Sequence, residues 1–331
     1  MRLAGLATHI PTGRIAAETI IAAAGGTRAE AQVFCRMFDM THVSAVPEGE
    51  TLMPQLSGIL DDLNCDQDVS VPDALIHVHG QPLQVPNGVA SPIQPLRQSH
   101  PFLANVQRCY DVDQHNCSGM FWALDLARTL LGTGLATSVL ILGGDSHIGL
   151  PVRDRYVPGC TLMGDAFCGI VVDLDQAGPQ FGKIALHTHP EFASGRAGTT
   201  AQMGAFFAAH SDMVARALED VNFGWSGKGA LLPHNVNRMA WSSFARSYNV
   251  AASRIRLDLL PDVGHCYVCD PFLLLAAERE RDPHLRGAPT LLSVGMGGYV
   301  GAAGIVPAAK IIEKSENIKK EAAPCMQLLD Y

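Results

Sequence analysis

The chain has 331 residues, of which 47% are hydrophobic and 17% charged, and its formal net charge at pH 7 is −8. This composition predicts a compact globular protein and excludes a largely disordered chain. The acidic balance disfavours nucleic acid as a partner, because nucleic-acid-binding domains carry a basic surplus. No apolar run is long enough to span a bilayer, so we expect no membrane association.

The predicted helices and strands alternate along the chain. Helices are expected at Arg28–Phe38, Met53–Leu63, Ser118–Leu131, Ala201–Leu218, Val236–Tyr248 and Asp270–Arg279, and strands at Ala74–His79, Ser138–Leu142, Gly169–Val172, Gly182–His187 and Thr290–Val294. The strands are short, β-branched runs bounded by turn residues. This alternation predicts an α/β protein with at least partly parallel sheets.

A turn-rich stretch at Leu174–Gln180 divides the chain into two parts of similar size. We therefore expect an N-terminal lobe over residues 1–175 and a C-terminal lobe over residues 176–309. Residues 310–331 begin with a charged amphipathic run, which predicts a surface helix or a frayed tail.

The nine cysteines and the first residues of the chain bear on its compartment. The cysteines are scattered, without the spacing of a disulfide framework, which favours a reducing environment. The N-terminal stretch lacks the continuous apolar core and cleavage site of a signal peptide. We expect a cytoplasmic protein.

Cys117 lies where a polar run meets the apolar segment Ser118–Leu131. At the first turn of a helix, free backbone N–H groups and the helix dipole favour the thiolate form of a cysteine. Because the thiolate is the nucleophilic form, this position predicts covalent catalysis. The alternative is a buried and inert cysteine.

Four segments, taken in chain order, resemble the thiolase superfamily and, within it, the β-ketoacyl-ACP synthase III-like enzymes. They are the nucleophile segment His115–Gly119, the strand and turn at Leu140–Ser146 and Leu162–Gly169, the His-Asn-Val-Asn segment within Pro233–Arg238, and the glycine-rich turn within Leu291–Tyr299. The resemblance implies a five-layered α/β/α/β/α fold with two related lobes, and a homodimer.

The resemblance also assigns roles to individual residues. Cys117 would take an acyl group from a thioester, and the backbone N–H groups of Cys117 and Gly297 would form the oxyanion hole. His234 and His265 would act as neutral imidazoles that donate N–H groups to an enolate oxygen. The synthase III enzymes carry asparagine where this chain has His265, and small residues where it has Gln114, His115 and Asn116.

The same resemblance implies an acyl-CoA or an acyl carrier protein thioester as substrate, with no permanently bound cofactor and no metal. Asn237, Arg153, Arg155 and Arg238 are the candidate contacts to CoA or the carrier, although ordinary solvated arginines are the alternative for the last three. Gly164 and Asp165 predict a turn and a helix start. Cys266 and Cys269 have metal-site spacing, but no second pair accompanies them, so we expect packing residues.

Three functions remain open. The first is decarboxylative Claisen condensation between the acyl-enzyme and a malonyl-type thioester. The second is transfer of the acyl group to an oxygen or nitrogen nucleophile, with a histidine as general base. The third is a non-catalytic subunit that supports an active partner.

Overall fold

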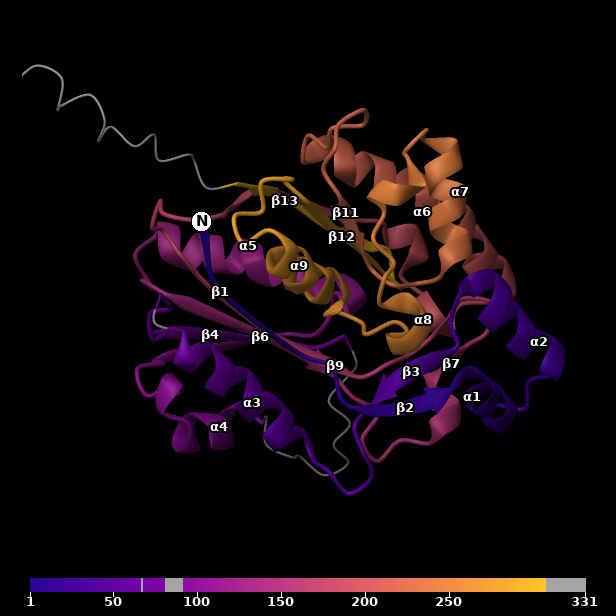
Figure 1. Cartoon of the computed structure of the whole chain (residues 1–331), viewed down its shortest axis with the longest axis horizontal. Helices are drawn as coiled ribbons and strands as arrows, with labels where there is room; N and C mark the ends of the chain where they lie inside the picture. The colour runs from indigo at the N-terminus through magenta and orange to yellow at the C-terminus, as the bar shows by residue number, and fades with distance from the viewer. Residues whose placement is uncertain (67, 81–91, 308–331) are drawn as a thin grey trace, which may run out of the picture.

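The computed structural model describes residues 1–66, 68–80 and 92–307 (Figure 1). Its strands are β1 (Arg2–His9), β2 (Gly13–Ala16), β3 (His42–Ala45), β4 (Ala74–Val78), β5 (Arg108–Val112), β6 (Val139–Asp145), β7 (Tyr156–Val157), β8 (Thr161–Leu162), β9 (Ala166–Asp173), β10 (Gln180–Thr188), β11 (Leu231–Pro233), β12 (Thr290–Gly295) and β13 (Tyr299–Val306). Its α-helices are α1 (Ala17–Ala23), α2 (Arg28–Val33), α3 (Leu52–Cys65), α4 (Ile93–Ser99), α5 (Gly119–Gly132), α6 (Thr200–Asp220), α7 (Arg238–Ser247), α8 (Leu260–Val263) and α9 (Asp270–Arg281).

The main sheet consists of two similar halves joined edge to edge. Its strand order is β11-β12-β13-β10-β1-β9-β6-β4-β5. In the first half, β1 and β9 and then β9 and β6 pair antiparallel, whereas β6, β4 and β5 are parallel. In the second half, β10, β13, β12 and β11 repeat the first four strands with the same directions. The halves meet where Arg2 pairs with Gln180.

Two helices occupy the space between the half-sheets. Helix α5 contacts β4 and β6 of its own half and also β10 and β13, while α9 contacts β11, β12 and β1. Helix α3 covers β1 and β9 on the outer side, and α6 covers β10 and β13 with α7 beside it (Figure 1). The predicted five-layered α/β/α/β/α architecture is confirmed.

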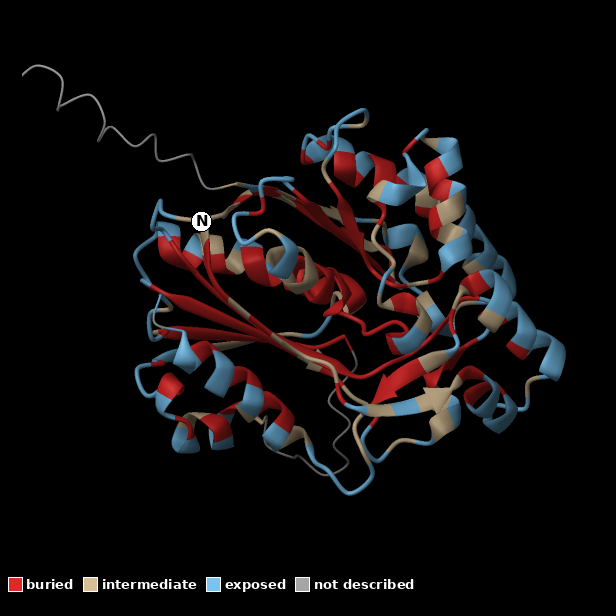
Figure 2. Cartoon of the chain, viewed as in Figure 1, coloured by how far each residue is buried: buried red, intermediate tan, exposed pale blue. Residues whose placement is uncertain are grey.

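The central layer is apolar because helices α5 and α9 bury apolar faces between the half-sheets. The rings of Phe121 on α5 and Phe272 on α9 lie 5.9 Å apart, and both side chains are fully buried. Gly301 on β13 allows this approach, since a Cβ there would lie 2.5 Å from the Phe121 ring. Burying one such aromatic side chain contributes about 2–3 kcal/mol. Figure 2 shows most strands of the main sheet as buried, whereas the outer helices alternate between buried and exposed residues.

Two of the sequence-based expectations require correction. The helix expected at Arg28–Phe38 is two elements, because the α-helical turns of α2 end at Val33 and a wider π-helical turn, η1 (Phe34–Phe38), follows. Asp165 starts no helix; it lies just before β9 and accepts hydrogen bonds from the backbone N–H of Val46 and both terminal nitrogens of Arg155. The tail expected at 310–331 lies outside the described residues.

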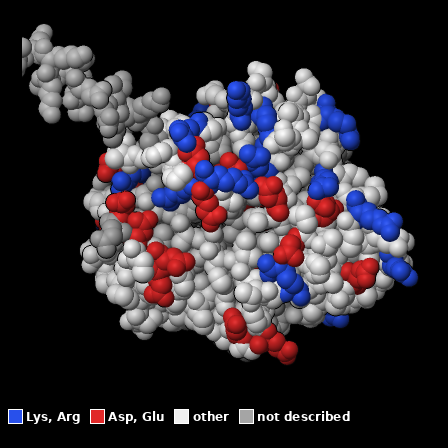
Figure 3. All heavy atoms as spheres, in the orientation of Figure 1, with Lys and Arg blue, Asp and Glu red and all other residues white. Residues whose placement is uncertain are grey.

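Acidic and basic side chains are interspersed on the face drawn in Figure 3, without a single-sign field across it. Within the described ranges, no helix combines the length and the apolar character that crossing a bilayer requires.

Candidate active site

The nucleophile segment is a short turn immediately before α5. Cys117 lies in the 3₁₀ turn η3 (Asn116–Ser118) and is 5% exposed. Strand β12 holds this turn from behind, because the Ser293 hydroxyl donates to the Cys117 carbonyl at 2.8 Å. Gly295 permits the contact, since a Cβ there would lie 2.7 Å from the His115 carbonyl oxygen. Ser293 on β12 therefore anchors the turn that carries Cys117.

Cys117 forms one end of a chain of three polar side chains. Its Sγ lies 3.1 Å from Nε2 of His265. The other ring nitrogen, Nδ1, lies 2.5 Å from Oδ2 of Asp270. All three side chains are buried. A thiol, an imidazole and a carboxylate in this order form a nucleophile, its base and the group that orients the base.

Asp270 is fixed at the first turn of α9. Its Oδ2 accepts the backbone N–H of Asn235 at 2.6 Å, and its Oδ1 accepts that of Cys266 at 2.8 Å. Burial would lower the pKa of His265, but the charges of Cys117 and Asp270 and hydrogen bonds to both raise it to about 10. His265 is thus protonated when Cys117 is ionised. The neutral state expected for this imidazole concerns the acylated enzyme, in which Cys117 carries no charge, and it stays a prediction.

His234 has the opposite environment. It follows β11, and its ring centre lies 5.9 Å from that of His265 and 5.4 Å from that of His210 on α6. Burial, with repulsion from His210 and His265, holds the pKa of His234 well below its ordinary range. Trp241 packs against the ring and donates its indole N–H to the His234 carbonyl at 3.0 Å. His234 is therefore a neutral imidazole, as expected from the sequence.

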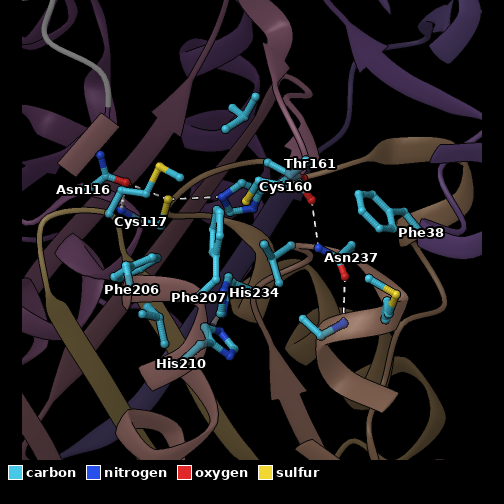
Figure 4. A pocket seen from close by; sticks show the side chains of 18 of the residues that line it. Phe38, Asn116, Cys117, Cys160, Thr161, Phe206, Phe207, His210, His234 and Asn237 are labelled. Atoms are coloured by element: carbon cyan, nitrogen blue, oxygen red, sulfur yellow. Dashed lines mark hydrogen bonds between the residues drawn. The ribbon is translucent and has the colours of Figure 1, made fainter. Parts of the chain in front are cut away.

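These groups meet at the wall of a cavity of about 730 Å³ (Figure 4). Cys117, His234 and His265 all line it. Most of the remaining wall is apolar and includes Val157, Met163, Phe206, Phe207, Val236, Tyr267 and Met296. A volume of this size with a few convergent polar groups suits an apolar organic substrate. Two arginines, Arg196 and Arg246, also line the cavity and are exposed.

The four residues expected to contact CoA or a carrier differ in position. Asn237 lines the cavity, but its side chain caps α7 through the N–H of Ala240 and donates to the Cys160 carbonyl at 2.8 Å. Arg153 is exposed, beside Asp154. Arg238 is half-exposed and pairs with Asp39. None of these observations tests the predicted contacts.

Arg155 is a correction. The side chain is buried and binds Asp165 with both terminal nitrogens, at 2.9 and 2.8 Å. Burial would raise the pKa of Asp165, but hydrogen bonds from His147 and Arg155 lower it to about 2. Because the guanidinium of Arg155 is buried in this ion pair, it is not available to a phosphate at the surface, and Arg155 supports the fold.

The oxyanion hole stays a prediction. Gly297 has a φ of 112° and follows Met296, which packs against the cluster around Cys117. The backbone N–H of Cys117 donates to Oδ1 of Asn116 at 2.9 Å. In this conformation a side chain occupies the donor that an oxyanion would use.

Three residues of the site were missed by the sequence reasoning. Asp270 and His210 were predicted only as members of the helices Asp270–Arg279 and Ala201–Leu218, with no role in the site. Asn116 was noticed only as a bulky neighbour of the thiol. His115 was expected to be structural, and its ring stacks on Trp122 with centres 4.4 Å apart. A carboxylate five residues after a histidine, at a helix N-terminus, was the one available signal for Asp270.

Comparisons with known proteins show similar sequences and structures. Residues 110–190 match the family model of 3-oxoacyl-[acyl-carrier-protein (ACP)] synthase III. A β-ketoacyl-[acyl-carrier-protein] synthase III of Sphingopyxis alaskensis is 24% identical over 210 residues, which are 57% of this chain and 64% of that relative. The match therefore spans less than two thirds of the length of that relative.

Two solved structures extend the likeness to almost the whole chain. The 3-oxoacyl-[acyl-carrier-protein] synthase III of Aquifex aeolicus has a TM-score of 0.74 at 15% identity, covering 92% of this chain and 99% of that one. Cerulenin-bound OleA of Xanthomonas campestris has a TM-score of 0.76 at 13% identity, covering 92% and 96%. At such identities the likeness establishes the fold.

Proposed function

We propose that this chain, a synthase III-like protein of the thiolase superfamily, is a condensing enzyme that carries its acyl group on Cys117. One observation carries the proposal: Cys117 Sγ lies 3.1 Å from His265 Nε2 at the wall of a largely apolar cavity. The donor would be an acyl-CoA or an acyl carrier protein thioester. The exposed arginines at the cavity, Arg196 and Arg246, suit the phosphate of a phosphopantetheine arm.

Acylation would start from the ion pair between the Cys117 thiolate and protonated His265. The Cys117 thiolate attacks the thioester carbonyl carbon, a new C–S bond forms, and the bond to the departing sulfur breaks. The departing thiolate takes a proton either from His265 or from solvent. Asp270 holds the proton on Nδ1 of His265 in both cases, so the two outcomes differ only in whether Nε2 carries a proton.

Condensation requires Nε2 of His265 to keep its proton. A malonyl-type thioester then loses carbon dioxide, and the resulting enolate oxygen accepts the Nε2–H of His265. Neutral His234, in the tautomer protonated on Nε2, donates a second N–H. The carbanion attacks the acyl carbonyl, a C–C bond forms, and Cys117 leaves as thiolate. Donors arranged in advance around a developing oxyanion contribute about 3–4 kcal/mol each.

Acyl transfer to an oxygen or nitrogen nucleophile is the second candidate, and Asp270 favours it. Once Nε2 has lost its proton, His265 is a free acceptor whose orientation the carboxylate fixes. It can then remove the proton of an alcohol or amine as the nucleophile attacks the acyl carbon. Cys117 departs as thiolate, and His265 ends protonated beside it, which restores the starting state.

Intact-mass measurement tests the proposal. The protein would be incubated with a panel of acyl-CoA and acyl carrier protein thioesters, with Cys117→Ala as the control. We expect an acyl adduct on the wild type and none on the variant. No adduct across the panel would reject the proposal and favour the third possibility, a non-catalytic partner subunit.

A second measurement separates the two chemistries. Labelled malonyl thioester added to the acylated enzyme should release carbon dioxide if the enzyme condenses. Loss of the adduct to an alcohol or amine without carbon dioxide would favour transfer. The cytoplasmic location and the homodimer remain proposals; size-exclusion chromatography with light scattering tests the latter.

A further inference from the structure

Asn116, the residue before the nucleophile, makes an unusual pair of contacts. Its Oδ1 accepts both the backbone N–H of Cys117 and the Cys117 thiol, each at 2.9 Å (Figure 4). The residue also lines the cavity. It therefore touches the reacting sulfur, the candidate oxyanion donor and the space where substrate would lie.

The backbone at this position selects a residue such as asparagine. Asn116 has a φ of 50°, in the left-handed region that asparagine tolerates better than most residues. Gly295 leaves room for its side chain, since a Cβ there would lie 3.1 Å from Asn116 Cβ. Among the described residues, Cys117 alone forms hydrogen bonds with the side-chain amide of Asn116. The amide can therefore rotate about its Cβ–Cγ bond.

Ionisation of the Cys117 thiol changes its sulfur from a hydrogen-bond donor to the Asn116 amide into a hydrogen-bond acceptor. An S–H group donates to an oxygen, but a thiolate repels the amide oxygen and attracts the amide N–H. The other groups near the sulfur are the protonated His265, backed by Asp270, and the buried thiol of Cys160. His265 supplies one donor, and a half-turn of the Asn116 amide would supply a second with almost no change in volume.

We propose that Asn116 is a further catalytic residue: its amide turns over when Cys117 ionises and donates Nδ2–H first to the thiolate and then to the acyl oxygen. The same turn removes the acceptor of the Cys117 backbone N–H. Two N–H donors then face the place where the oxyanion forms. This inference rests on the proposed acylation of Cys117.

The alternative is that Asn116 is only a structural cap with a fixed oxygen. The two roles predict opposite effects when the side chain is removed. A fixed acceptor stabilises the neutral thiol, so its loss would make Cys117 ionise more easily and react faster. A donor stabilises the thiolate, so its loss would make Cys117 react more slowly.

Asn116→Gly is the decisive variant, because glycine keeps the positive φ. The rate of iodoacetamide alkylation at Cys117 would be followed at pH 7 by peptide mass. Exposed Cys65 serves as the reference thiol in the same tube. Asn249→Gly is the matched control, since Asn249 is an exposed asparagine with a φ of 51°. We expect about tenfold slower alkylation of Cys117 in Asn116→Gly and unchanged rates elsewhere.

Acylation gives the second readout. We expect the rate of acyl-enzyme formation to fall about a hundredfold in Asn116→Gly, as for loss of one oxyanion donor. Asn116→Ser, which keeps a donor near the sulfur, should recover part of both rates and covers the case in which the glycine variant fails to fold. Unchanged or faster alkylation in Asn116→Gly would overturn the inference. If no thioester acylates even the wild type, the proposed function fails, while the alkylation comparison still decides the role of Asn116.

Discussion

The two histidines of the site are buried equally but carry different charges. His234 and His265 have ring centres 5.9 Å apart, and each is at most 4% exposed. Burial lowers the pKa of His234 far below its usual range, whereas the pKa of His265 rises to about 10. The difference lies in the neighbours. The charges of Cys117 and Asp270, at the two ring nitrogens of His265, outweigh burial and raise its pKa. His234 is instead packed against His210 and Trp241.

This comparison separates two tasks in one cavity. A buried imidazole with no acid beside it stays neutral and can only offer or accept one hydrogen bond. A buried imidazole held by a carboxylate can exchange a proton with the thiol. The side of the site formed by Cys117, His265 and Asp270 therefore carries charged groups. The side formed by His234 is uncharged.

Asp270→Asn should have the largest effect on this difference. The variant keeps the shape of the side chain but removes one of the two charges that raise the pKa of His265. We expect acylation of Cys117 to slow on the order of a thousandfold at pH 7, with part of the loss recovered at higher pH as the thiol ionises unaided. Stopped-flow acylation across pH tests this, with exposed Asp125→Asn as control. A rate within tenfold of wild type would show that the carboxylate has no such role.

Replacing each histidine by asparagine should separate the two tasks. His265→Asn should slow acylation at least as much as Asp270→Asn, on the order of a thousandfold or more. It also leaves the buried carboxylate of Asp270 without its cationic partner, which lowers the melting temperature. The double variant His265→Asn with Asp270→Asn should regain that stability. His234→Asn should instead leave acylation near wild type and impair the second half-reaction. Equal acylation defects in both single variants would contradict the division of tasks.

The buried, neutral His210 beside His234 should make the folded protein less stable in acid. Burial lowers the pKa of His210 to about 4, so the unfolded chain binds this proton from about pH 6.5 downward and the folded chain does not. The contribution of neutral His210 to the free energy of unfolding is therefore fully present above pH 6.5 and is lost as the pH falls. The loss is on the order of 3 kcal/mol at pH 4.

His210→Phe should remove this part of the acid dependence. Urea unfolding at pH 7, 5.5 and 4 measures it against wild type, and exposed His284→Gln should leave the dependence unchanged. An unaltered pH dependence in His210→Phe would mean that His210 is charged in the folded protein.

Ser293→Ala should have the smallest effect. The variant removes the hydrogen bond from the Ser293 hydroxyl to the Cys117 carbonyl at 2.8 Å. We expect a loss of about 1 kcal/mol in unfolding free energy and less than a tenfold change in acylation. Chemical denaturation and acylation rates check this against exposed Ser247→Ala. A loss above a hundredfold in acylation would assign Ser293 a direct role.

The sequence predicted the parts of the fold whose local signal is strong. Helices such as α5 and α6 and the β-branched strand β12 lie within a few residues of their expected positions. Strands β1 and β13 were missed because they are rich in alanine and glycine, and they become strands through pairing with β9, β10 and β12. Such pairing is a tertiary effect that local composition does not contain.

The site was predictable only in part for the same reason. Cys117 stands out because an apolar helix follows it, and His234 and His265 were found through the resemblance. The pairing of His265 with Asp270 depends on the bend between them, where Tyr267 has a φ of 49°. Spacing in the sequence does not reveal that bend, so the contact between Asp270 and His265 was not predicted.

The order of the chain has a consequence during synthesis. Cys117 and His265 are 148 residues apart, so the thiol leaves the ribosome well before the group that takes its proton. The nascent N-terminal half has a cysteine without its base, and an isolated thiol with an ordinary pKa is mostly protonated near neutral pH. Under the proposed function, reactivity toward thioesters would begin only once His265 and the segments that position it have folded onto the N-terminal half. The order of translation would then keep Cys117 unreactive in the nascent chain.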